Sequence, residues 1–344
     1  MSELSQIPDF SKLRVAVVGD LVADHYLYAR PQRLSREAPV MVLSHEREKV
    51  GAGGAANVAC NLSSLGAQVR IFGAAGDDAH GCELTRLLDA NGIDTAGLDL
   101  LSGWTTPTKT RVLAAEPRRS LQQVLRIDRE PKAPPDDLVR RRVAERVRGL
   151  AAEVDAVLVA DYEYGMVCEE VAAAVRKLAA CGVVVLVDPR DLIDSFRGVT
   201  AFSPNVTELA RFSNEAPEDL DEPERLHGVA ARFLERTRAR LLLVTLGNRG
   251  MALYGEGLGP AGVSVPASGT GEVTDVCGAG DTAAAVFALA LAMDLDPILG
   301  MVLANAASGV VCLEHGAAMC SPAQLRAALP AAPLPRLPVK ASAS

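Results

Sequence analysis

The sequence predicts an α/β fold in which a mostly parallel sheet is covered by helices on both faces. Five short runs of apolar, mainly β-branched residues have continuous hydrophobicity without alternation, as expected for strands that are buried on both sides. Stretches with helical periodicity lie between these runs, and such an alternation of strands and helices favours parallel pairing. The predicted strands are Arg14–Gly19, Val69–Gly73, Ala156–Ala160, Val183–Val187 and Leu241–Val244.

The predicted helices fill intervals between these strands and follow the last of them. They are Ala55–Leu65, Leu138–Ala152, Cys168–Cys181, Pro223–Thr237 and Ala283–Met293. Polar residues come at or soon after the strand ends, namely Asp20, Asp77, Asp161, Asp188 and Thr245. Because ligands of open parallel sheets bind beyond the carboxyl ends of the strands, these positions are candidates for a site.

Two segments depart from this pattern and predict a small β lid outside the main sheet. Tyr26–Val50 and Thr105–Glu130 are more polar and partly alternating, which is typical of extended strands with one wet face. The chain after Leu329 is rich in Pro and Ala and is expected to be unpacked. We therefore expect one domain over residues 10–330 and a flexible tail over residues 331–344.

Composition restricts the class of protein. The 344 residues are 49% hydrophobic and 23% charged, with a net charge of −8, as in a globular protein without affinity for nucleic acid or an anionic membrane. The most apolar stretch, Thr282–Met293, is too short to cross a bilayer. Seven scattered cysteines without a CxxC pair predict reduced core thiols and a cytoplasmic location, with neither disulfides nor a zinc site. An anionic small substrate remains compatible with this composition.

The first motif with chemical meaning is DVCGAGDT, Asp275–Thr282, which leads into an apolar helix. A turn of small residues at a helix start exposes backbone N–H groups that bind anions, so Gly278, Ala279 and Gly280 predict an anion hole. Asp281 would lie among these amides and could accept a proton from a hydroxyl nucleophile. The alternative is that the motif only caps the helix, because Asp and Thr are both good N-caps.

The second motif is GAGGAAN, Gly51–Asn57, which also leads into a helix. It fits the dinucleotide fingerprint G-x-G-x-x-A, but the segment before it is polar and does not suit a buried first strand. A tight glycine turn that presents its backbone and Asn57 to a polyhydroxylated ligand is favoured over dinucleotide binding. Asp24 would accept hydrogen bonds from the hydroxyl groups of such a ligand.

Two further motifs suit a nucleotide triphosphate. In Pro204–Glu208, Asn205 and Glu208 either form a capping box or face one point, where Glu208 would hold hydrated Mg²⁺. Val244–Gly250 ends a strand and turns through two glycines, which suits contact with a nucleotide. Walker, HExxH, GxSxG and protein-kinase signatures are absent from the sequence.

These four motifs, in this order, resemble the ribokinase-like PfkB sugar kinases over roughly residues 10 to 330. Three segments resemble the branch that phosphorylates heptose 7-phosphate at C1 to the 1,7-bisphosphate. They are EAPV at 37–40, TKTRVL at 108–113 and ADYEYG at 160–165. The 344 residues leave no room for the nucleotidyltransferase domain that is fused to the kinase in bifunctional relatives, so a stand-alone kinase domain is expected.

The resemblance implies a role for each matching residue. Asp281 would be the general base, with Gly278, Ala279 and Gly280 as the anion hole for the transferred phosphoryl group. The sugar phosphate would be held by Asp24, Gly53, Gly54, Asn57, Lys109, Arg111 and Asp161. ATP would be held by Asn205, Glu208, Thr245, Gly247, Gly250 and Asn305, with Mg²⁺ at Glu208 through water. Asp275 and the Cys277 carbonyl would match a monovalent-cation site, which suits K⁺, and the lid would form a homodimer.

The chain departs from the branch pattern at four positions. Tyr164 and Arg190 each replace a usual Lys, Cys277 replaces a common Thr, and Arg36 replaces a usual Pro. Cations for the substrate phosphate are then sought in the lid, where Lys109 and Arg111 alternate along one predicted strand and share a face. Arg33, Arg36 and Arg190 are further candidates. Three alternatives stay open: another PfkB sugar kinase, a catalytically silent sugar- or nucleotide-binding regulator, and a dehydrogenase.

Overall fold

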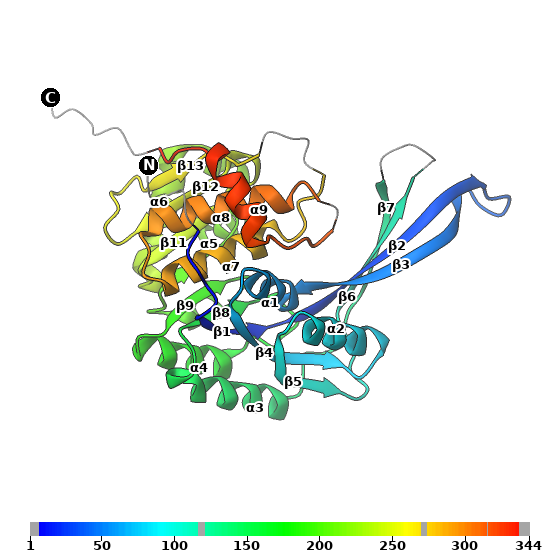
Figure 1. Cartoon of the computed structure of the whole chain (residues 1–344), viewed down its shortest axis with the longest axis horizontal. Helices are drawn as coiled ribbons and strands as arrows, with labels where there is room; N and C mark the ends of the chain where they lie inside the picture. Colours follow the sequence, from blue (N-terminus) through cyan, green and yellow to red (C-terminus); the bar gives the residue numbers. More distant parts are fainter. Residues whose placement is uncertain (1–6, 116–120, 270–273, 315, 337–344) are drawn as a thin grey trace.

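A nine-stranded sheet runs through the body of the molecule (Figure 1) within the residues that the computed structural model describes, 7–115, 121–269, 274–314 and 316–336. The strand order is β13-β12-β11-β10-β9-β8-β1-β4-β5, parallel from β11 to β5 and antiparallel at β12 and β13. The bounds are β1 Arg14–Gly19, β4 Gln68–Gly76, β5 Asp94–Leu101, β8 Ala156–Ala160, β9 Val184–Asp188, β10 Ala201–Phe202, β11 Leu241–Thr245, β12 Met251–Gly255 and β13 Val263–Val265. The predicted sheet is confirmed.

Helices cover both faces of this sheet because successive strand residues point to opposite sides. In β1, Val15 and Val17 pack into one apolar core, while Ala16 and Val18 pack into the other. The first core is covered by α1 (Ala55–Ser64), α2 (Ala79–Ala90), α7 (Ala279–Ala292), α8 (Pro297–Val311) and α9 (Pro322–Ala328). The second is covered by α3 (Asp137–Arg148), α4 (Glu169–Ala180), α5 (Val206–Ser213) and α6 (Pro223–Thr237). Short 3₁₀ turns lie at Gly149–Ala152, Ile193–Phe196, Pro217–Asp221, Gly247–Arg249 and Leu329–Ala331.

The lid is a separate sheet of four strands in the order β3-β2-β6-β7, and it projects from the body as an arm (Figure 1). Its strands are β2 (Leu21–Leu34), β3 (Met41–Gly54), β6 (Thr108–Ala114) and β7 (Gln122–Arg129). Strands β2 and β3 form a long antiparallel hairpin whose base extends further into the body than residues 26–50. The base is apolar and buried, which made its residues look like parts of the body rather than of a lid.

Several elements carried too weak a pattern to be predicted. Strand β5 is a partly exposed edge strand, and β10 has only two residues.

Of the seven cysteines, all free, only Cys60, Cys168 and Cys320 are buried, and Cys181 is exposed, so the core-thiol prediction holds for three of them. No helix in the described part of the chain is long and apolar enough to span a membrane.

Part of the segment expected to be unpacked is attached to the body. Ala332 is partly buried against the first core, and Arg336 exchanges two backbone hydrogen bonds with Ser264 in β13. The rest of the expected tail, residues 337–344, lies outside the described residues.

Candidate active site

The first turn of α7 lies at the carboxyl ends of the central strands and carries the DVCGAGDT motif. Gly278 precedes the helix with φ at 78°, a left-handed conformation that disfavours a side chain. A Cβ atom at this position would also lie 2.6 Å from the Asn57 side-chain nitrogen. Glycine is therefore required here by both backbone conformation and space. The Ala279 amide donates to the Val276 carbonyl oxygen at 3.3 Å, which leaves the Gly280 and Asp281 amides of the first helical turn for an anion.

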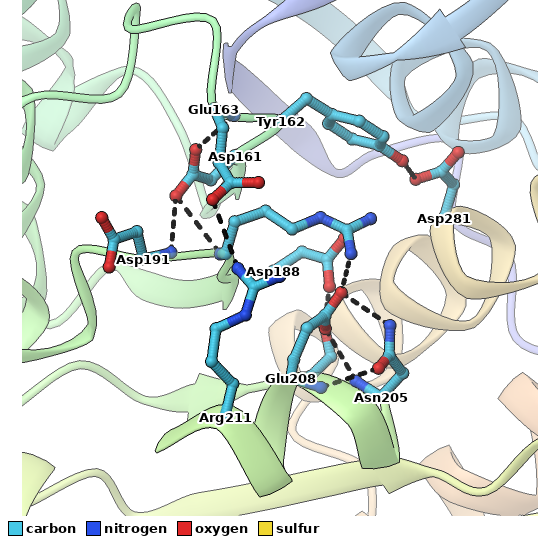
Figure 2. Close-up of polar contacts among 11 residues, drawn as sticks. Asp161, Tyr162, Glu163, Asp188, Asp191, Asn205, Glu208, Arg211 and Asp281 are labelled. Carbon is cyan, nitrogen blue, oxygen red and sulfur yellow. Dashed lines mark hydrogen bonds and ion pairs between the residues drawn. The ribbon is translucent and has the colours of Figure 1, made fainter. Parts of the chain in front are cut away.

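Asp281 accepts two hydrogen bonds from side chains of other elements (Figure 2 draws the one from Tyr162). Asn57 Nδ2 donates at 2.7 Å and Tyr162 Oη donates at 2.6 Å. Burial raises the pKa of Asp281 to about 6, although these two hydrogen bonds act in the opposite direction. The carboxylate makes no side-chain cap to α7, so the interpretation of Asp281 as a helix cap is wrong.

Asn57 is itself held by a buried network between α1 and α7. Asn61 Nδ2 donates to the Asn57 backbone and side-chain oxygens, and Thr282 Oγ1 donates to Asn61 Oδ1 at 3.0 Å. The amide of Asn57 is thereby oriented with its nitrogen toward Asp281. The glycine-rich motif at 51–57 thus contacts the DVCGAGDT motif through Asn57, whose side chain was predicted to face the ligand.

Tyr162 was not among the predicted site residues. It follows Asp161 in the loop after β8, and Asp20 fixes this loop by accepting hydrogen bonds from three backbone amides, those of Tyr162, Tyr164 and Met166. Its only signal in the sequence is a tyrosine directly after a strand-end aspartate. Sequence reasoning assigned no role to its hydroxyl group because the contact with Asp281 spans 119 residues.

The predicted sugar-binding residues gather where the lid meets the body. Asp24 forms a buried ion pair with Arg111, and Asp24 is paired in register with Lys109 on the neighbouring strand. A Cβ on Gly53 would lie 2.9 Å from Asp24 Oδ2, so this glycine leaves room for the carboxylate. Gly54 has φ at 56°, and a Cβ there would lie 2.5 Å from the Asp20 carbonyl oxygen.

Two of the predicted sugar-phosphate ligands, Arg111 and Asp161, bind other groups of the protein. The Arg111 guanidinium contacts Asp24 and lies 5.6 Å from the Tyr26 ring centre, so it does not line the nearby basic cavity described below. Asp161 accepts hydrogen bonds from the amides of Glu163, Arg190 and Asp191, which fixes the loop after β9 (Figure 2). Arg111 and Asp161 thus make positioning contacts within the protein, and their contacts with a ligand stay predictions.

A cavity of about 750 Å³ opens beside Asp281, between the ends of β9 to β11 and the first turn of α7. Its wall contains every residue predicted for the phosphates and the nucleotide: Asn205, Glu208, Thr245, Gly247, Gly250, Gly278, Ala279, Gly280, Asp281 and Asn305. Apolar side chains such as Val206, Met251 and Val276 complete the wall. Tyr162 and Arg190 also line it and were not predicted to do so, whereas Asp188, which lines it too, was a strand-end candidate for a site. We call this the nucleotide-side cavity.

Asn205 and Glu208 form a capping box at the start of α5, so the structural interpretation of this pair is confirmed. The Asn205 amide donates to Glu208 Oε2 at 2.8 Å, and Asn205 Nδ2 donates to Glu208 Oε1 at 2.6 Å (Figure 2). Glu208 also forms an ion pair with Arg190. Burial raises the pKa values of Glu208 and of the neighbouring Asp188, whose carboxylate accepts a hydrogen bond from Ser203 Oγ at 3.4 Å.

The carboxylate of Asp275, which was predicted to hold a monovalent cation, is hydrogen-bonded to backbone amides. Asp275 Oδ1 accepts a hydrogen bond from the Cys277 amide at 2.9 Å, and its Oδ2 accepts one from the Gly316 amide at 3.0 Å. Both oxygens therefore already fasten the loop. Across the described residues, no group of three or more His, Cys, Asp or Glu side chains could hold a metal ion. Mg²⁺ beside Glu208 and Asp188 would need phosphate oxygens and water as further ligands, which is its usual preference.

A second cavity of about 630 Å³ lies between the lid and the body. Its cationic residues are Lys109, Arg126, Lys132 and Arg190, and its acidic residues are Asp128, Glu130 and Glu163. Tyr164, the position that usually carries Lys, lies in the same wall. We call this the basic cavity. Arg33 and Arg36 are exposed and line neither of the two cavities.

Comparison with known proteins agrees with this arrangement. The family model of the pfkB family carbohydrate kinases matches residues 12–324. The bifunctional protein HldE of Pelobacter propionicus is 35% identical over 92% of this chain and 64% of its own length, and that of Methylococcus capsulatus is 37% identical over 96% and 67%. Against the first three such relatives, the chain spans 63 to 65% of their length.

Solved structures share the fold at low sequence identity. Arabidopsis thaliana ribokinase complexed with ribose and ATP has a TM-score of 0.70 at 23% identity, covering 92% of this chain and 98% of that one. Phosphofructokinase-2 from Escherichia coli in complex with potassium has a TM-score of 0.71 at 16% identity, covering 92% and 98%.

Proposed function

The chain belongs to the PfkB family of carbohydrate kinases, and we propose that it transfers the γ-phosphoryl group of ATP to the C1 hydroxyl of a heptose 7-phosphate. The observation that carries this proposal is the position of Asp281. Its carboxylate is buried at the N-terminus of α7, beside the nucleotide-side cavity and in contact with Asn57 and Tyr162.

The proposed reaction uses each part of this geometry. The sugar hydroxyl gives its proton to Asp281 while its oxygen attacks the γ-phosphorus, and the bond to the β-γ bridging oxygen breaks to release ADP. The Gly280 and Asp281 amides at the start of α7 stabilise the negative charge on the phosphoryl oxygens. ATP supplies the phosphoryl group, and Mg²⁺ near Glu208 and Asp188 would neutralise its charge. Asp24 would hold sugar hydroxyl groups, with Arg111 fixing its orientation.

The basic cavity supports a phosphorylated acceptor. Lys109 on β6 and Lys132 in the segment after β7 bring positive charge to the wall that contains Tyr164, while Arg126 is paired with Asp128 of the same wall. Burial lowers the pKa of Lys109, yet its ammonium group lies 5.5 Å from the Tyr162 ring centre and faces the same region. The cation missing at Tyr164 is thus replaced by cations from the lid. The HldE relatives and the three heptose-branch segments support heptose as the sugar.

The test is an ATP-turnover assay with a panel of sugars and of sugar 1-, 6- and 7-phosphates, with the product identified by phosphorus NMR. We expect kcat/KM for heptose 7-phosphate to exceed that of the other acceptors by about 10²-fold or more, since buried polar groups left unpaired penalise wrong substrates. Lys132→Ala should raise KM for the phosphorylated acceptor about tenfold, while the exposed Lys177→Ala serves as a control.

Other results of the panel would identify the alternatives. A preference for an unphosphorylated sugar or a 6-phosphate would assign the chain to another PfkB substrate. Binding of ATP and sugar without turnover would favour a regulator, and binding of NAD(P) would favour a dehydrogenase.

We propose that two copies associate through their lids. All eight residues of β7 are exposed, and the side chains of Val124, Leu125 and Ile127 expose more than half of their surface. An exposed apolar edge strand favours pairing with another chain. Sedimentation velocity should show a dimer that Leu125→Arg converts to a monomer. A monomeric wild type at the concentrations of the kinetic assay would refute the proposal.

A further inference from the structure

Arg190 is a candidate ligand of the substrate phosphate by sequence, but it has no role in the proposed mechanism. It is the only charged residue that lines both the nucleotide-side cavity and the basic cavity, among the lining residues that the structure describes. Tyr162, the other residue common to both walls, is hydrogen-bonded to Asp281. The Arg190 guanidinium lies 5.2 Å from the Tyr162 ring centre. A cation therefore lies close to the boundary across which a phosphoryl group would pass.

The side chain is held at one end only. Its Nη1 donates to Glu208, and the backbone amide of Arg190 donates to Asp161 Oδ2 at 3.2 Å. A guanidinium has five N–H donors, and Nε and Nη2 of Arg190 have no hydrogen-bond partner within the described residues. The side chain keeps 30% of its surface exposed toward these cavities. The guanidinium is thus anchored at Nη1, while its other N–H donors remain available to a ligand.

The surrounding charges explain why the guanidinium stays in place. Glu208, Asp188 and Asp281 all lie close enough to favour its charged form, and the Tyr162 ring offers a cation-π contact. The guanidinium neutralises an acidic wall that would otherwise repel a triphosphate. Neutralisation alone would need only a point charge, however, whereas the open, planar donors match the geometry of phosphoryl oxygens.

We propose that Arg190 binds the γ-phosphoryl group during its transfer and stabilises the charge on its equatorial oxygens. In this step the acceptor oxygen bonds to the γ-phosphorus, the β-γ bridging bond breaks with its electron pair leaving on ADP, and the hydroxyl proton goes to Asp281. The free N–H groups of Arg190 would meet the phosphoryl group in the nucleotide-side cavity, whose wall also contains Gly280 and Asp281. The inference rests on phosphoryl transfer to a sugar and not on the choice of heptose.

The test compares Arg190→Ala with Arg211→Ala, a nearby arginine that pairs with Glu163 and lines neither cavity. With any acceptor that the wild type phosphorylates, Arg190→Ala should lower kcat by about 10²-fold or more, since arginines that act on the transferred group contribute 10³ to 10⁵. KM for ATP and for the acceptor should change less than about threefold. Guanidinium ions added to the assay should restore part of kcat in this variant and should not affect Arg211→Ala.

A binding measurement separates this role from a structural one. ADP, aluminium fluoride and the acceptor together imitate the transition state of phosphoryl transfer. The wild type should bind this complex more tightly than ADP alone. Arg190→Ala should lose this difference in affinity while it binds ADP alone as the wild type does. Arg190→Lys preserves the charge beside Glu208, so it covers the case in which the alanine variant does not fold. Arg190→Lys should show a reduced kcat and a loss of affinity for the ADP–aluminium fluoride complex by the same factor.

Three results would overturn the inference. A rise in KM confined to phosphorylated acceptors would make Arg190 a ligand of the acceptor phosphate. Unchanged affinity for the fluoride complex in Arg190→Ala, or wild-type values throughout in Arg190→Lys, would leave no role for the donor fork. A wild type that ignores heptose 7-phosphate but phosphorylates another sugar refutes only the proposed function.

Discussion

Replacing Asp281 by Asn should separate catalysis from stability in a single residue. The carboxylate is 5% exposed, and its partners are the side chains of Asn57 and Tyr162. An amide is nearly the same size and can accept one of these hydrogen bonds, while the tyrosine hydroxyl can rotate to accept from the new N–H group. The fold should therefore persist, while the group that accepts the proton is lost.

The expected magnitudes follow from the pKa. Burial raises the pKa of Asp281 from 3.8 to about 6, and this difference corresponds to at most about 3 kcal/mol. Between these two values the unfolded chain has released its proton while the folded protein keeps it, so the wild type loses stability as pH rises through that window. At neutral pH the loss is complete, and Asp281→Asn, which is uncharged at every pH, should be more stable. Without the general base, kcat should fall by ~10²-fold or more.

The assay pairs steady-state kinetics with urea unfolding near neutral pH and at about pH 4.5, where the gain in unfolding free energy should shrink. The matched control is Asp20→Asn, because burial also raises the pKa of Asp20 to about 6. Asp20 accepts from three fixed backbone amides, so its amide variant should lose about 1–3 kcal/mol of stability. A kcat within a few-fold of wild type in Asp281→Asn would remove this residue from the mechanism.

Three further substitutions test the surroundings of this carboxylate. Tyr162→Phe removes a hydrogen bond to the charged form of Asp281, so the acid limb of the kcat/KM profile should move to higher pH by about one unit; an unchanged limb would mean that the tyrosine only fills space. Gly278→Ala places a methyl group against Asn57 and should lower kcat at least about tenfold, as steady-state kinetics would show. Arg111→Gln should raise KM equally for phosphorylated and unphosphorylated sugars, whereas a selective loss would make it the phosphate ligand.

The sequence predicted the chemistry-bearing turns better than their contacts. Residues such as Gly278 and Thr245 are recognisable because small or polar residues directly follow an apolar strand or precede an apolar helix, which is a local pattern. The structure places them around one cavity. Capping by Asn205 and Glu208 was equally local, because it depends on a spacing of three residues.

No local sequence pattern predicted the contacts between residues that are far apart in the chain. Arg111 alternates with Lys109 on one strand and suited a phosphate, but only the parallel pairing of β2 with β6 places it beside Asp24. Tyr162 reaches Asp281 because Asp20 fixes the loop after β8. Register and loop shape determine such contacts, and neither is encoded in the periodicity of the individual segments.

The contacts around the candidate site form two separate groups of residues, one in the body and one on the lid strands. Asp281, Asn57 and Tyr162 are joined by hydrogen bonds and all belong to the body, so the proton-accepting unit is assembled whatever the position of the lid. Asp24 and Arg111 are paired with each other, and both belong to lid strands. Both side chains are buried at the base of the lid, where its strands meet the body, so the Asp24–Arg111 pair is held next to the body. A sugar phosphorylated at Asp281 would touch both groups, so its acceptor hydroxyl would be placed by two units whose internal contacts are already formed in the protein.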